Sequence, residues 1–124
     1  MLTAEEFIRL FRVQQPNAPL DSVLVDHVIK QSLFVTARRN GELVGYVRIL
    51  TDGYLFGAVA DVRALPELFY DSEFLKRLLT EATLACPTRL VHAIHRADPK
   101  FMTSMGWQVG PQSYVHVDRP RVAM

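Results

Sequence analysis

The sequence of 124 residues has very little cysteine, no marked excess of either charge and no long hydrophobic run. Its single cysteine, Cys86, excludes an intrachain disulfide and any zinc site built from several cysteines. The 14 basic and 13 acidic residues give a net charge of +1, which leaves no broad basic surface for nucleic acid or an anionic membrane. No apolar stretch is long enough to span a bilayer, and the acidic start MLTAEE is unlike a signal peptide. We therefore expect a reducing, cytoplasmic setting, with neither nucleic acid nor membrane as a partner.

Glycine is missing from one segment where it would be informative. The stretch 60-ADVRALPELFYDSEFLKRLL-79 is predicted to form a strand, a loop and a helix in that order. In many phosphate-binding proteins a glycine-rich loop at this point feeds the helix N-terminus, and the backbone amides cradle the phosphate. The loop ELFYDSE (67–73) contains three acids, no base and no glycine. The sequence thus raises the question of whether a phosphate site was lost here or never existed.

The rest of the composition is that of an ordinary globular domain. Hydrophobic residues make up 49% of the chain and charged residues 22%. A chain of this length is expected to form one domain, residues 1–124, with a core that needs no metal or disulfide to stabilise it.

The first half of the chain predicts two helices and then antiparallel strands. Thr3 and Glu6 form a capping box before an apolar helical face, and Asp21 or Ser22 caps a second helix after the turn at 15–20. Two β-rich runs then flank Asn40-Gly41, the strongest short hairpin signal. A further break at 51–53 leads into a third strand, 54–62, which completes a meander.

The second half alternates helices and strands. Apolar residues from Phe74 to Ala82 recur at helical spacing, with Asp71 or Ser72 as the cap and Pro87 after the end. A strand at 90–94, a short helix from Pro99 and a strand at 107–117 follow, and the tail 118–124 is expected to be frayed. The order ααβββαβαβ predicts an α+β fold (α/β-like, three layers) with a mixed, mostly antiparallel central sheet flanked by helices.

Three phrases and their order resemble the GNAT superfamily of acetyl-CoA-dependent N-acetyltransferases. They are 40-NGELVGYVRILTDG-53, 60-ADVRALPE-67 and 101-FMTSMGWQVGP-111, and the resemblance covers roughly residues 32–112. The family usually has one more strand before the first helix, so the third strand here matches its fourth. The fold implied is the GNAT-like acyl-CoA N-acyltransferase fold.

The resemblance also implies a way of binding acetyl-CoA. Backbone groups of Val62 and Ala64 would bind the pantetheine arm as a neighbouring strand would. The following loop, in which Phe69, Tyr70, Asp71 and Ser72 stand, would wrap the pyrophosphate at the helix N-terminus. An amine would then attack the thioester, helped by a carboxylate or water as base and a tyrosine as acid.

The chain departs from the family pattern in two places. Phe69 stands where the family has Gln or Arg, and Tyr70 and Ser72 stand where it has glycine, so the backbone is less able to approach a phosphate. Asp71 and its acidic neighbours interact favourably with the positive end of the helix dipole, and their negative charge repels a diphosphate. The family's catalytic tyrosine falls on Met102, and a thioether cannot donate a proton.

Asp61 is the candidate catalytic residue, because it lies in the third strand beside the implied thioester. The competing interpretation, which we favour, is a strand residue that faces solvent or bonds to a neighbour. His92 and His95 point to opposite faces of a predicted strand, so they cannot bind one metal together, and structural roles are favoured. Cys86, just before Pro87, is interpreted as packing at a helix end rather than as a nucleophile.

The remaining residues of interest receive structural interpretations. Arg48 is interpreted as an exposed strand charge and Asp52 as a turn former. Lys76 and Arg77 are interpreted as a solvated helix face rather than as contacts for a cofactor phosphate. Core or edge packing, rather than a stacking platform, is favoured for the aromatic residues Tyr54, Phe56, Phe69, Tyr70 and Trp107.

The sequence therefore leaves two functions open. The first is acetyl-CoA-dependent acetylation of a small-molecule or protein amine, with no metal site. The second is a catalytically inactive GNAT-fold protein that binds a protein partner or a different ligand in the residual cleft. A homodimer through aromatic residues such as Phe69 and Tyr70 is compatible with either.

Overall fold

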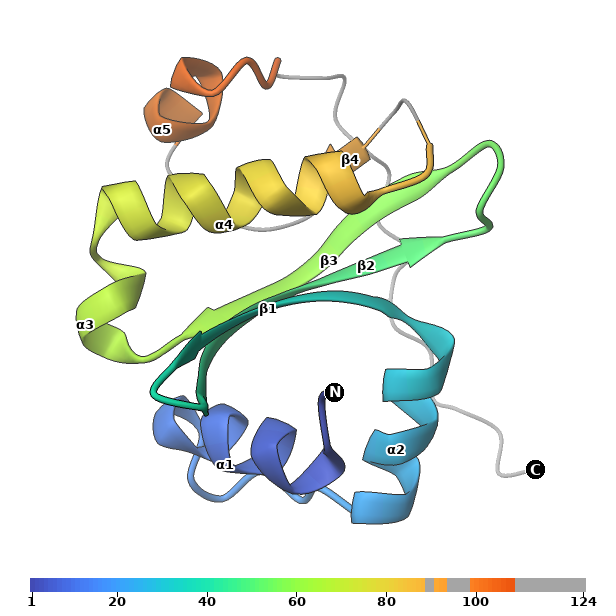
Figure 1. Cartoon of the computed structure of the whole chain (residues 1–124), viewed down its shortest axis with the longest axis vertical. Helices are drawn as coiled ribbons and strands as arrows, with labels where there is room; N and C mark the ends of the chain where they lie inside the picture. The colour runs from blue at the N-terminus through green and yellow to red at the C-terminus, as the bar shows by residue number, and fades with distance from the viewer. Residues whose placement is uncertain (89–90, 94–98, 109–124) are drawn as a thin grey trace, which may run out of the picture.

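The structure, a computed structural model, describes residues 1–88, 91–93 and 99–108. Four strands form one sheet in the order β1-β2-β3-β4, antiparallel except for the parallel β3–β4 pair. Helix α4 covers one face of the sheet, and α1 and α2 cover the other, which gives three layers (Figure 1). The predicted α+β class is confirmed. The elements are α1 (Ala4–Gln14), α2 (Ser22–Gln31), β1 (Leu33–Arg39), β2 (Glu42–Thr51), β3 (Gly57–Ala64), α3 (Pro66–Phe69), α4 (Ser72–Ala85), β4 (Val91–Ala93) and α5 (Pro99–Ser104).

Local sequence signals set the ends of the first elements as predicted. The Thr3 hydroxyl accepts the amide of Glu6, whose carboxylate accepts the amide of Thr3, so the capping box is complete. The carboxylate of Asp21, rather than Ser22, caps α2. Asn40 and Gly41 turn the β1–β2 hairpin with φ angles of 54° and 83°, the left-handed region that this turn demands.

Each face of the sheet has its own apolar cluster. Both β2 and β3 contribute to the α4 side, and α1, α2 and β2 contribute to the other. The α4 side is built from the buried residues Val47, Ile49, Val59, Val62, Leu75, Leu78, Leu79, Ala82 and Cys86. The α1 and α2 side is built from Phe7, Leu10, Val25, Leu43 and Tyr46, with Phe34 against the rings.

Gly45 lets α4 approach the sheet closely. A Cβ atom at this position would lie 3.2 Å from the carbonyl oxygen of Arg63 and 3.2 Å from Cζ of Phe74. Both distances are tighter than ordinary van der Waals contact, so only glycine fits without displacing the ring or the neighbouring strand.

Helix α1 is tied to the sheet by an ion pair between Glu6 and Arg38. Arg38 donates through Nη2 to Glu6 Oε1 at 3.0 Å and to the carbonyl oxygen of Met1 at 3.1 Å. The hydrogen bond from Arg38 is the main cause that lowers the pKa of Glu6 to about 2. Arg38 is therefore committed to the α1 side of the sheet.

The structure differs from the sequence prediction in three segments. The third strand begins at Gly57 rather than at Tyr54, because the carboxylate of Asp52 binds the amides of residues 54–56 and holds them in a turn. The segment after Pro66 is not an irregular loop, since Pro66–Phe69 forms a helical turn. Proline at the first position of that turn fits the backbone it requires. Residues 107–108, the start of the predicted strand at 107–117, are not in a strand. The rest of that segment and the tail 118–124 lie outside the described residues.

Candidate functional site

An extra residue in β3 sets the candidate site. Arg48 pairs with Asp61, but the next residue of β2, Ile49, pairs with Val59, so Ala60 is unpaired as a β-bulge. The bulge allows Val59 and Val62 to face α4 together. Asp61, between them, bonds instead to Tyr46 of the cluster beneath α1.

The hydroxyl of Tyr46 fixes the Asp61 carboxylate. Tyr46 is 0% exposed, and its Oη donates a hydrogen bond of 2.6 Å to Oδ2 of Asp61. Burial first, and then the charge of Asp61, raise the pKa of Tyr46 far above its ordinary value near 10. The tyrosine is hence protonated, and able to donate a hydrogen bond, at neutral pH.

Arg63 forms a long ion pair with the same carboxylate but no hydrogen bond to it. Its guanidinium lies 3.6 Å from the centre of the Phe11 ring, and its Nη1 donates to Oε1 of Gln14 at 3.0 Å. The Nε atom of Arg63 lies 3.8 Å from Oδ1 of Asp61, which is too long for a hydrogen bond. The described residues give Oδ1 no hydrogen-bond donor, and the Asp61 side chain is 22% exposed. One oxygen of Asp61 is thus anchored and the other can accept a proton or a hydrogen bond.

The interpretation of Arg48 as an exposed strand charge was wrong. It is only partly exposed, and its Nε is buried without a hydrogen-bond partner in the structure. Arg48 pairs with Asp61 at the bulge, and this pairing places it within the sheet rather than at an edge. The Nε atom of Arg63 is likewise buried without a hydrogen-bond partner, and leaving a buried polar atom unpaired costs stability.

The N-terminus of α4 is already capped from within the chain. Oδ1 of Asp71 accepts the amides of Glu73 at 3.1 Å and Phe74 at 3.2 Å. These amides are among the first free donors of the helix, the groups that would otherwise bind an anion. Ser72 is the first residue of α4, and Tyr70 is 86% exposed, its ring edge-on to Phe69.

The second half of β3 carries the residues expected to bind pantetheine. Val62 and Ala64 are buried, and the described pairing of β3 with β4 covers Gly57–Val59. Met102, at the position of the family's tyrosine, lies in α5 and packs partly buried against the α4-side cluster. His92 lies in β4 with its backbone in register with Ala58, and His95 lies outside the described residues.

Other sequence interpretations have mixed outcomes. Cys86 is buried at the end of α4, Asp52 forms a turn, and Trp107 packs against the core, all as predicted. Tyr54 and Phe56 were expected to pack in the core or at an edge, but Tyr54 is 82% exposed and Phe56 48% exposed. The prediction was wrong for these two residues because their strand starts later than expected. It was also wrong for Tyr70, which is 86% exposed.

The described part of the chain has neither a candidate metal site nor a candidate membrane span. Within residues 1–88, 91–93 and 99–108, no cluster of three or more His, Cys, Asp and Glu side chains could hold a metal ion. None of the described helices is long and apolar enough to cross a membrane.

Comparison with known proteins identifies the architecture. No family profile and no curated sequence matches the chain. A GNAT-family acetyltransferase from Streptococcus pneumoniae TIGR4 superposes with a TM-score of 0.74 and 19% identity, covering 97% of this chain and 94% of that one. The chain has the GNAT fold. The predicted resemblance to that fold is thereby confirmed over nearly the whole chain.

Two further structures show the range of proteins with the GNAT fold. AAC(6')-Iy, solved with the bisubstrate analogue CoA-S-monomethyl-acetylneamine, has a TM-score of 0.69 and 14% identity, with 94% of this chain and 91% of that chain covered. A ribosomal-protein-alanine N-acetyltransferase from Brucella melitensis biovar Abortus 2308 has a TM-score of 0.64 and 18% identity, with 90% and 91% covered. The names of these two proteins point to different acceptors, an aminoglycoside-type compound and a ribosomal protein. The GNAT fold alone therefore does not indicate the acceptor substrate of this chain.

Sequence reasoning missed Tyr46 and Arg63. A signal was present for Tyr46, because Tyr46 and Arg48 stand at alternate positions in an otherwise apolar predicted strand, whereas Arg63 lies beyond the predicted end of the third strand. Finding the contact with Asp61 required the register across β2 and β3, in which Tyr46 pairs with Arg63 and Arg48 with Asp61.

Replacing Tyr46 with phenylalanine should destabilise the protein by about 1–3 kcal/mol, because the Asp61 carboxylate loses its buried donor. In the wild type the raised pKa contributes stability that is fully present below pH ~10 and is lost as the pH rises through the folded value, since only the unfolded phenol ionises near 10. Urea denaturation measures the first effect, and absorbance of phenolate during alkaline titration measures the second.

The matched control for this prediction is Tyr54→Phe, at a tyrosine that is 82% exposed. It should change the unfolding free energy by less than about 0.5 kcal/mol. Equal stability of the Tyr46 and Tyr54 variants would show that the Tyr46–Asp61 hydrogen bond does not contribute.

Proposed function

We propose that this protein is an acetyl-CoA-dependent N-acetyltransferase, and that Asp61 accepts the proton of the acceptor amine. The observation that carries the proposal is the state of the Asp61 carboxylate, with Oδ2 held by Tyr46 and Oδ1 left without a donor among the described residues. It lies at a bulge in β3, on a strand that runs beside β4 and then into the helical segment before α4. The GNAT fold supports a transfer reaction at this strand.

Asp61 would act as a base toward the acceptor. Acetyl-CoA, as the acyl-donor substrate, carries its acetyl group as a thioester. The amine nitrogen forms a bond to the acyl carbon, the carbon–sulfur bond breaks, and the amine proton passes to Oδ1 of Asp61 directly or through water. Tyr46 keeps the carboxylate oriented throughout. The thiolate that leaves takes its proton from solvent, because Met102 has none to give.

The residues fit the two ends of acetyl-CoA unequally. Buried Val62 and Ala64 offer a regular strand backbone for the pantetheine arm. At the diphosphate end the α4 amides of Glu73 and Phe74 are bound by Asp71. We propose that the diphosphate binds beside Phe69, Tyr70 and Ser72. Binding there requires the Asp71 carboxylate to release the amides of Glu73 and Phe74, or the diphosphate to lie next to that carboxylate.

The decisive test is calorimetric titration of the whole chain with acetyl-CoA and with coenzyme A. Micromolar binding supports the proposal, and no binding at millimolar donor overturns it. Asp71→Asn keeps a capping side chain but removes its charge, so it should tighten binding about two- to fivefold, the factor that corresponds to 0.3–1 kcal/mol at a helix terminus. Glu42→Gln, an exposed charge at the hairpin, is the control and should leave the affinity unchanged.

A second candidate function is binding without acetyl transfer. The observation that favours it is the same Asp71 cap, because a helix N-terminus already satisfied by its own carboxylate has less to offer a diphosphate. In that case the chain would use the GNAT fold to hold a protein partner or a different ligand. Failure of acetyl-CoA to bind both the wild type and Asp71→Asn would select this candidate.

A further inference from the structure

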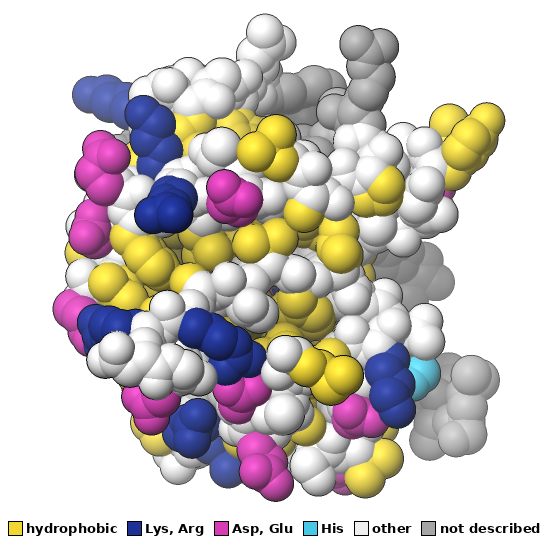
Figure 2. Space-filling view, in the orientation of Figure 1, with side chains coloured by type: hydrophobic (Ala, Val, Ile, Leu, Met, Phe, Trp, Pro, Cys, Tyr) yellow, Lys and Arg dark blue, Asp and Glu magenta, His cyan; other side chains and the backbone are white. Residues whose placement is uncertain are grey.

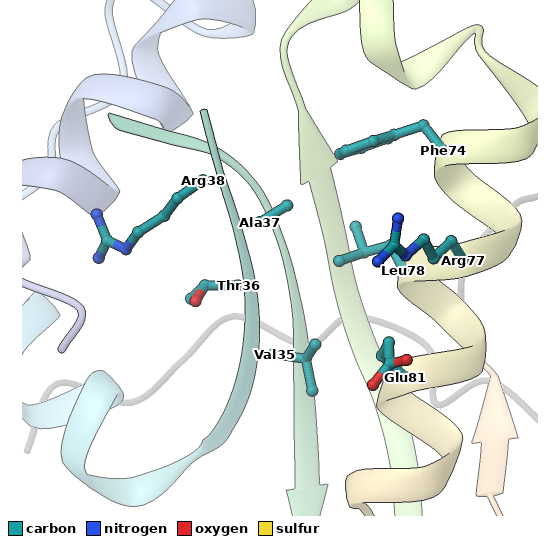
Figure 3. Close-up of a pocket in the computed structure, with 8 residues that line it drawn as sticks. All are labelled: Val35, Thr36, Ala37, Arg38, Phe74, Arg77, Leu78 and Glu81. Carbon is teal, nitrogen blue, oxygen red and sulfur yellow. The ribbon is translucent and has the colours of Figure 1, made fainter. Parts of the chain in front are cut away.

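A groove lies on the opposite face of the sheet from Asp61, between β1 and α4. Its volume is about 450 Å³, and its apolar lining comes from Val35, Ala37, Phe74 and Leu78. Figure 3 shows these side chains pointing toward one another across the groove, whereas Thr36 and Arg38 point away toward α1. The space-filling view shows hydrophobic side chains at the surface between the charges of α4 and strand β1 (Figure 2).

Strand β1 borders this groove as an edge strand. In the described sheet it is hydrogen-bonded to β2 on one side and has no strand on the other. Its pairing with β2 is regular from Leu33 to Ala37, and that segment contains no charge, proline or bulge. These are the devices by which proteins usually protect an edge, so the segment is well suited to pair with another strand.

Helix α4 has a symmetric pattern of side chains in and beside the groove, of which Phe74, Arg77 and Glu81 line the groove itself. Arg77 and Glu81 stand two positions before and after Leu79, and Phe74 and Leu84 stand five positions before and after it. Phe74 is only partly buried and Leu84 is 75% exposed. Neither Arg77 nor Glu81 forms an ion pair with a residue of the described chain, although both line the groove. If a second α4 lay antiparallel to the first, Arg77 would face Glu81 of the other copy and Phe74 would face its Leu84.

We propose that the groove is an interface between two copies of this chain. A two-fold axis pairs the two β1 strands antiparallel and joins the sheets into one, with the two α4 helices side by side above the junction. Such an interface is isologous, since each residue contacts its symmetry counterpart on the other copy. Under this axis Arg77 of each copy faces Glu81 of the other, so the charged pattern is complementary to itself. The site of association is distinct from Phe69 and Tyr70 and does not depend on acetyl transfer.

Charge reversal tests this interface without disturbing the fold, because Arg77 and Glu81 are exposed. Arg77→Glu brings a new carboxylate of one copy opposite Glu81 of the other, and Glu81→Arg brings two guanidinium groups together. Each single variant should raise the dimer dissociation constant about tenfold, since two attractive contacts become repulsive. The double variant R77E/E81R should restore wild-type association.

Sedimentation velocity over a concentration series measures these effects, and circular dichroism checks that α4 remains helical. A 1:1 mixture of the two single variants should associate more tightly than either alone, because both contacts across the axis are then of opposite sign. Lys76→Glu is the matched control, as it changes the same charge at an exposed position on the other flank of α4, and it should leave association unchanged. Leu84→Lys should weaken association as well.

Three results would overturn the proposal. One is a wild-type chain that remains monomeric at every concentration, which would assign the groove to another occupant such as a peptide. Another is a dimer that is insensitive to Arg77→Glu and Glu81→Arg. The third is failure of the double variant and of the mixture to recover association, which would exclude the two-fold axis.

Discussion

Asp61→Asn is expected to lower kcat for acetyl transfer to a primary amine about 10²–10⁴-fold, the usual contribution of a general base. The asparagine side-chain oxygen can still accept the hydrogen bond from Tyr46, so the fold and the position of the side chain are retained. Its amide group cannot accept the proton of the amine. The loss should therefore appear in kcat, whereas calorimetric affinity for acetyl-CoA stays the same.

The experiment compares wild type, Asp61→Asn and Glu42→Gln by release of the coenzyme A thiol with a panel of primary amines. Glu42 is exposed at the start of β2, so its variant controls for the loss of one negative charge. Asp61→Asn activity equal to that of the control would move proton removal to water or to another residue. That result would favour the competing interpretation, in which Asp61 is a strand residue with a structural role only.

Leu79→Ala should destabilise the protein by about 2–5 kcal/mol, the largest stability effect that we expect from a single substitution. Leu79 is 2% exposed and belongs to the cluster that joins α4 to β2 and β3. Close packing around Gly45 limits how far α4 can collapse onto the sheet, so the space left by the removed atoms should remain largely open.

Urea denaturation at a dilute protein concentration measures this effect without a contribution from self-association. The control is Leu24→Ala in α2, the same chemical change at a side chain that is 66% exposed. It should alter the unfolding free energy by less than about 0.5 kcal/mol. Similar losses in the two variants would mean that the α4 cluster is not the principal source of stability.

The architecture was predictable from the sequence because local signals and their order agree. Asn40 and Gly41 require φ angles that few other residues tolerate, so the hairpin they form leaves a clear mark in the sequence. Thr3 and Asp21 act through side-chain bonds to amides within three residues. Signals of this range do not depend on distant parts of the chain.

The candidate site was only partly predictable because its contacts cross the sheet. Asp61 could be singled out by its place in the strand, but its bond to Tyr46 depends on register and on the bulge at Ala60. A bulge moves side chains between faces without any distinctive residue at its position. Arg48 was misjudged for the same reason, since alternation in one strand does not show which atoms the next strand will cover.

The loop before α4 shows a different limit. The absence of glycine and the excess of acids were visible in the sequence, and Asp71 was one of the two predicted caps. The helical turn Pro66–Phe69 was not anticipated, because four residues are too few to show a helical period.

The order of strands in the sheet determines which strand pair has the largest entropic cost of loop closure. Strands β1, β2 and β3 follow one another, so each antiparallel pair closes a loop of a few residues. The β3–β4 pair joins Gly57 to Val91 across the whole of α3 and α4. Closure entropy rises with loop length, by about 0.6 kcal/mol per doubling, so this parallel pair is the costliest contact of the sheet to form. Packing of α4 against β2 and β3 offsets that cost. The helix thereby determines whether β4 pairs with β3, the strand that carries Asp61.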